Sequence, residues 1–122
     1  MTLREAISEV DELYPNSYND GHKVRWLSEL DGNIRKKIID THDGAPETPF
    51  TGYTINSLDE QLIVPFPFES IYRWWLIAQI DITDGEVNRY NNDIALYNKA
   101  YSEFWNDYNA GHMPIGENIN YF

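Results

Sequence analysis

The stretch FESIYRWWLIAQIDITD, residues 68–84, decides the fold. Its apolar side chains do not keep to one stripe. At 100° per residue, one face carries Ile71, Trp75 and Ile82, and the nearly opposite face carries Tyr72, Leu76 and Ile80. Pro67 suits the first turn of a helix and Glu69 suits its positive end. We therefore predict a helix over residues 68–84 that is buried almost all round.

A second long helix is predicted directly after it, over residues 85–109. Its apolar positions step by three and four over three heptads, at Val87, Tyr90, Ile94, Tyr97, Tyr101, Phe104 and Tyr108. We expect this seam to pack into the core of the domain. Gly111 and Pro114 end the helix. The pattern leaves open whether the two helices continue through Gly85 or bend there.

Two further helices are predicted in the first third of the chain. Thr2 and Glu5 form the pattern of a capping box, so a first helix covers residues 2–14 and Pro15 stops it. A second helix, over residues 19–41, has one apolar stripe, formed by Val24, Leu27, Leu30, Ile34 and Ile38.

The remaining segments are predicted to be irregular. Residues 43–57 hold two glycines and two prolines with little periodicity, which indicates a long loop. Residues 112–122 form a tail with apolar side chains near its end, and such a tail usually docks on something. The sequence thus predicts one all-α domain, residues 1–122, built as a small bundle of about four helices with a long loop between the second and third.

Composition limits the partners that this chain can have. Nine Lys and Arg face twenty Asp and Glu, a net charge of −11, and there is no cysteine. The acidic excess disfavours sequence-specific nucleic-acid binding and attraction to anionic membranes. The longest apolar run, residues 74–78, is too short to span a membrane. The absence of cysteine fits a reducing cytosol, and the start of the chain does not have the pattern of a signal peptide.

A search for catalytic chemistry finds little. Phosphate-binding glycine loops, zinc-protease motifs and serine-hydrolase motifs are absent from the sequence. Asp40, His42 and Asp43 are the best candidate metal ligands, although a polar helix end explains them better. The acid pairs Glu9 with Glu12 and Asp81 with Asp84 are expected to be solvated. We predict no catalytic residue, no metal site and no cofactor, hence no enzyme.

Aromatic side chains are the more informative feature, since the chain holds four Trp, nine Tyr and five Phe. A helix without a polar face in a small domain suggests that a neighbouring chain covers it. The hypothetical interface residues are Trp26, Tyr72, Trp74, Trp75, Tyr121 and Phe122.

Several stretches resemble small proteins encoded in prophages of Gram-positive gut bacteria. They are KVRWLSELDG at 23–32, IIDTH at 38–42, LIVP at 62–65, DITDGEVNRYNN at 81–92 and HMP at 112–114. These relatives are usually taken to be head–tail connector, or adaptor, proteins of long-tailed phages. The resemblance implies a small helical subunit that self-associates into a ring between the portal protein and tail-side adaptors. It also implies a place in the neck of the virion, assembly in the host cytoplasm, and passage of DNA through the channel.

Two other interpretations remain beside the connector. An acidic helical adaptor, including a DNA mimic that inhibits a basic DNA-binding protein, accounts for the net charge. An enzyme built on the carboxylates or on His42 is the least favoured.

Overall fold

The computed structural model describes residues 1–115, and nearly all of its regular structure is helical. Four α-helices are present: α1 (Leu3–Leu13), α2 (Asp20–Ile34), α3 (Ser70–Thr83) and α4 (Val87–Gly111). A π-helix, η1 (Arg35–Ile39), continues α2, and a short 3-10 helix, η2 (Ile55–Ser57), lies in the long loop. The described residues contain no strand, only two isolated β-bridges. The predicted all-α bundle is confirmed.

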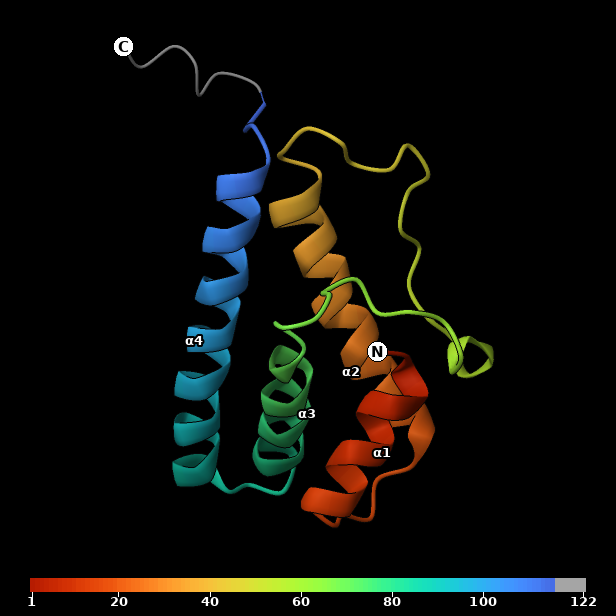
Figure 1. Ribbon diagram of the computed structural model, residues 1–122. Coiled ribbons are helices and arrows are strands. Elements are labelled where there is room, and N and C mark those ends of the chain that lie inside the picture. Colours follow the sequence, from red (N-terminus) through yellow and green to blue (C-terminus); the bar gives the residue numbers. More distant parts are fainter. Residues whose placement is uncertain (116–122) are drawn as a thin grey trace.

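Helix α3 lies at the centre of the bundle, with α1, α2 and α4 packed around it (Figure 1). Its side chains Ile71, Tyr72, Leu76 and Ile80 are almost completely buried by those helices. The other helices of this chain therefore cover most of the apolar circumference of α3. The suggestion that a neighbouring chain covers this helix is not needed for most of its circumference, because α1, α2 and α4 of the same chain pack against it.

Helices α3 and α4 form a hairpin and run side by side in opposite directions (Figure 1). The question left open at Gly85 is thereby answered: the chain bends there, with Gly85 at φ +80°, a conformation that favours glycine. Phe104 of the α4 seam is buried, and Tyr97, Tyr101 and Tyr108 pack partly buried against the core. Val87, at the start of the seam, is exposed.

The first two helices follow their sequence signals. The Thr2 hydroxyl accepts a hydrogen bond from the Glu5 amide at 3.2 Å, and the Glu5 carboxylate accepts one from the Thr2 amide at 2.9 Å. The predicted second helix corresponds to α2 and η1 together. In its last turn the Asp40 amide donates to the Arg35 carbonyl, five residues back, at 2.8 Å, so the helix widens there.

The long loop is held against α2 and η1 rather than left free. Arg35 donates to the carbonyls of Pro46 and Thr48, both at 2.7 Å. Further along, the Tyr53 amide donates to the Ser28 hydroxyl at 2.9 Å. Among the described residues, no helix is both long and apolar enough to cross a bilayer.

Gly52 is the position in this loop where a side chain fits worst. Its φ is +97°, and an added Cβ would lie 2.7 Å from the Ser28 hydroxyl oxygen. We expect Gly52→Ala to lower the free energy of unfolding by about 1–3 kcal/mol, measured by urea denaturation. Gly111→Ala is the control, because a Cβ there meets nothing within 4 Å. Equal stability of the two variants would contradict this packing.

Candidate functional site

The carboxylate of Asp31 on α2 is a fully buried polar group. It accepts hydrogen bonds from the Tyr72 hydroxyl at 2.6 Å, the Tyr53 hydroxyl at 2.5 Å and the Ile63 amide at 3.1 Å. The Tyr72 hydroxyl in turn accepts a bond from the Val64 amide at 2.8 Å. One carboxylate thus joins α2, α3 and the segment that leads into α3.

Burial raises the pKa of Asp31, while the hydrogen bonds from Tyr53 and Tyr72 act in the opposite direction. No solvent reaches this carboxylate, so it braces the fold and does not face a substrate. Sequence analysis missed this role. A signal was present, because Asp31 stands on the apolar stripe of α2, four residues after Leu27 and three before Ile34.

Tyr72 was therefore wrongly placed among the hypothetical interface residues. Its side chain is 0% exposed and its hydroxyl is occupied by Asp31 and Val64. Trp26 and Trp75 are partly buried, and the Trp75 indole donates to the Trp26 carbonyl at 2.7 Å. Trp74 is also partly buried. Tyr121 and Phe122 lie outside the described residues.

A second buried acid lies where α3 meets α4. Asp81 is buried and accepts a hydrogen bond from the Tyr14 hydroxyl. Its expected solvation was wrong, whereas Asp84 is indeed exposed. The carboxyl of Asp93 on α4 lies against that of Asp81, and one of its oxygens has no hydrogen-bond partner among the described residues.

Burial, together with hydrogen bonding to Asp81 and repulsion by it, raises the pKa of Asp93 to about 7, and Arg89 partly opposes this rise. Two facing carboxyl groups favour sharing one proton. The two acids of the other predicted pair have different surroundings. The Glu9 carboxylate forms an ion pair with the Arg73 guanidinium at 2.6 Å, and Glu12 is exposed.

The His42 side chain connects the end of η1 to α4. One ring nitrogen, Nδ1, contacts the Ile38 carbonyl at 2.7 Å, and the other, Nε2, contacts the side-chain oxygen Oδ1 of Asn109 at 3.0 Å. Trp105 and Tyr108 pack edge-on against the ring. Both nitrogens are occupied and Asp40 pairs with Arg35 at 2.7 Å. The described residues contain no group of three or more metal-ligating side chains.

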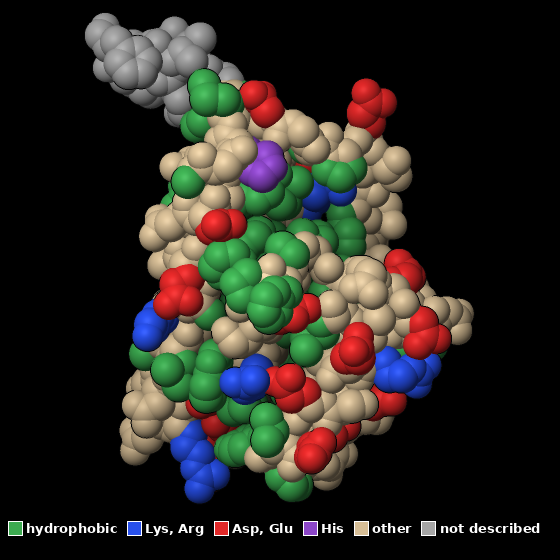
Figure 2. Space-filling view, viewed as in Figure 1, with side chains coloured by type: hydrophobic (Ala, Val, Ile, Leu, Met, Phe, Trp, Pro, Cys, Tyr) green, Lys and Arg blue, Asp and Glu red, His purple; other side chains and the backbone are tan. Residues whose placement is uncertain are grey.

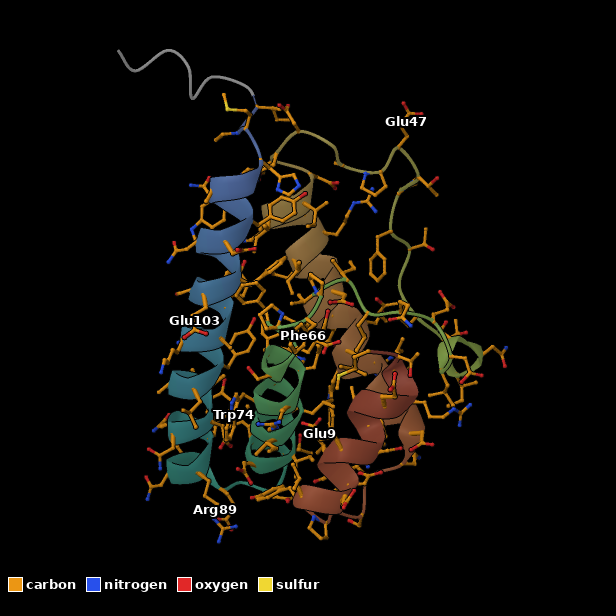
Figure 3. The ribbon with its side chains drawn as sticks, in the orientation of Figure 1. Glu9, Glu47, Phe66, Trp74, Arg89 and Glu103 are labelled. Carbon is orange, nitrogen blue, oxygen red and sulfur yellow. The ribbon has the colours of Figure 1, made fainter. Side chains whose placement is uncertain are left out.

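Exposed apolar side chains such as Leu13 and Ile55 lie elsewhere, but several lie on or beside α3 and α4. Figure 2 shows hydrophobic side chains gathered there, amid scattered acids. Phe66, just before α3, is 83% exposed, and Leu96 on α4 is 41% exposed. Phe66 borders a hollow of about 230 Å³ whose polar lining includes Glu9 and Arg73. A second hollow, of about 160 Å³, lies between α3 and α4 beside Trp74 (Figure 3).

The two hollows differ in how their charged side chains are arranged. The charged side chains that line the first hollow neutralise one another. Arg73 forms an ion pair with Glu9, and the Met1 ammonium forms one with Glu69 at 2.7 Å. The second is lined by three apolar and three polar side chains: Trp74, Leu96, Ala100, Ser70, Lys99 and Glu103. A surface of this kind suits contact with another protein.

Comparison with known proteins adds nothing to this description. No protein-family model, no curated protein and no solved structure matches the chain.

The Asp31 network leads to a prediction about hydroxyl groups. Tyr72→Phe removes a donor to Asp31 and leaves the buried Val64 amide unpaired, so we expect a loss of about 2–4 kcal/mol in unfolding free energy. Tyr101→Phe is the control, since within residues 1–115 that hydroxyl makes one long contact, 3.4 Å from the Asn33 side-chain oxygen. The measurement is urea denaturation; a Tyr72→Phe variant as stable as the control would contradict the network.

The Asp93 carboxyl leads to a prediction about pH. Its native pKa lies above the unfolded value of 3.8, so the native state binds the extra proton. This group's contribution to stability therefore falls as pH rises from about 4 to about 7, by at most about 1.4 kcal/mol per unit. We expect Asp93→Asn to flatten that slope in thermal melts and to be more stable than wild type at pH 8. Exposed Asp107→Asn is the control; parallel pH profiles for all three proteins would refute the shift.

Proposed function

We propose that this chain is a structural subunit that works by assembling with other proteins, as a phage head–tail connector. The proposal rests first on the resemblance of residues 23–32, 38–42, 62–65 and 81–92 to prophage-encoded connector proteins. In this role the chain forms a ring between the portal and the tail-side adaptors in the virion neck, and DNA passes through its channel without base-specific contact.

The observation that carries the proposal is large apolar side chains left in water on a strongly acidic chain. Phe66 is 83% exposed, Leu96 is 41% exposed and Trp74 is only partly buried, so each forgoes part of the roughly 1.5–3 kcal/mol that full burial would give. A free-standing monomer seldom keeps such a surface. A subunit in a ring keeps such a surface because neighbouring subunits cover it.

The net negative charge of the chain also supports the connector proposal. Four of the nine Lys and Arg side chains are engaged in ion pairs inside this chain: Arg4, Lys23, Arg35 and Arg73. Few cations are then left to bind phosphates, and the acidic excess repels the DNA backbone. An acidic lining lets DNA slide through a channel without adhering to it. The same charge also favours the alternative partner, a basic DNA-binding protein blocked by a DNA mimic.

The test is the mass of the purified chain by light scattering over a concentration series, with and without the portal protein of the same phage. We expect a closed ring in at least one condition, and its mass gives the number of subunits. A monomer that ignores the portal at every concentration would contradict the connector. If that monomer bound a basic DNA-binding protein instead, the DNA-mimic alternative would replace it.

A further inference from the structure

Helix α4 is held to the rest of the chain differently in its two halves. In the second half, Ala100 and Phe104 are buried against the core. The Asn109 side chain, near the end of this half, contacts His42 at 3.0 Å. Apolar burial and a polar contact therefore fix the second half of α4 beside the end of η1 (Figure 1).

The first half of α4, residues 87–99, has a single buried side chain, Asp93. The apolar residues of its seam are only half-buried or exposed. This half begins just after Gly85, where the chain turns with φ +80° and an added Cβ would meet nothing within 4 Å. A carboxyl is thus the one deeply buried side chain by which this half is held.

The group that Asp93 meets on α3 is a second buried carboxyl, that of Asp81. Asp93 is 8% exposed and Asp81 is 2% exposed, and Asp93 Oδ2 has no hydrogen-bond partner among the described residues. While one of the two carboxyls keeps a proton, it donates a hydrogen bond to the other. Once both are ionised, neither has a hydrogen to donate, and two like charges face each other with little water to screen them.

Two further titratable groups act on this pair. The Tyr14 hydroxyl, directly after α1, donates to Asp81. Arg89, near the hairpin end of α4 and beside Tyr14, favours the ionised form of Asp93 (Figure 3). Burial and Asp81 outweigh Arg89, because the pKa of Asp93 rises to about 7.

We propose that Asp81 and Asp93 form a proton-dependent latch, in which one shared proton holds the first half of α4 on α3 and its loss releases that half about Gly85 while the second half stays in place. The open helix does not keep the extra proton near neutral pH, so the open form gains population as the pH rises. Release separates Tyr97 from Trp75, whose ring centres lie 5.1 Å apart in the closed form. This latch belongs to the single chain and does not depend on the proposed assembly.

Hydrogen exchange with detection by mass spectrometry tests the latch on the full-length chain. The labelling times are corrected for the intrinsic effect of pH on exchange. From about pH 5.5 to about pH 8.5 we expect the protection of residues 91–99 to fall about tenfold or more, because the open form becomes more populated. Protection in α2 and in residues 100–111 should change much less.

Two variants remove the shared proton with little change of shape. Asp93→Asn and, separately, Asp81→Asn each leave one carboxyl facing one amide, and the amide donates a hydrogen bond at any pH in this range. In either variant we expect residues 91–99 to keep nearly the same protection at both ends of the pH range. Asp107→Asn is the matched control, because Asp107 is an exposed acid on the same helix and its loss should leave the wild-type pH dependence intact.

Three results would overturn the latch. The first is constant protection of residues 91–99 in wild type over this pH range. The second is a wild-type pH dependence in both Asp93→Asn and Asp81→Asn. The third is an equal fall of protection in α2, which would mean that the whole fold opens and that no local release of α4 takes place.

Discussion

The carboxylate of Asp31 fixes the positions of three segments that lie far apart in the chain. A buried charge is costly unless donors surround it, and here Tyr53, Tyr72 and the Ile63 amide supply them. These donors come from the long loop, from α3 and from the approach to α3. This polar centre holds the second half of the loop in place together with the Tyr53–Ser28 hydrogen bond and the packing of Tyr53 on the core. Through Val64 and Tyr72 it also sets where α3 begins, and hence where Phe66 stands.

The sequence predicts the helices well because periodicity is a local property. The capping box at Thr2, the stripe of α2 and the heptad seam of α4 all appear in the structure close to their predicted bounds. The bend at Gly85 could not be decided, since glycine is compatible with either conformation. The π-helical turn at Arg35–Ile39 was also missed, because its longer hydrogen bonds depend on packing at the end of α2.

The polar centres were not predicted, because they depend on which residues meet in space. Asp81 reads as a surface acid beside Asp84, yet Tyr14, 67 residues away, and Asp93 enclose it. From the sequence, Tyr72 was predicted to be an aromatic interface residue. Its hydroxyl instead donates a hydrogen bond to Asp31, 41 residues away in the chain. In each case the partner is distant in sequence, and a wheel drawn on one helix cannot reveal it. A central helix and an interface helix have the same apolar circumference.

The fold and the proposed function depend on different side chains of this protein. The buried acids, the tyrosine hydroxyls and His42 hold helices and loops to one another, and the described hollows are shallow and partly apolar. The accessible surface is acidic and carries several apolar side chains, among them the exposed Phe66 and Leu96 and the partly buried Trp74. A helical domain with such a surface suits a role as a building unit.

Electron microscopy of the chain mixed with the portal protein of the same phage tests that role most directly. The connector account predicts a ring of copies on the axis of the portal, with the face that bears Phe66, Trp74 and Leu96 turned toward a neighbouring chain. Portal particles without added density, or copies bound with that face open to solvent, would contradict it.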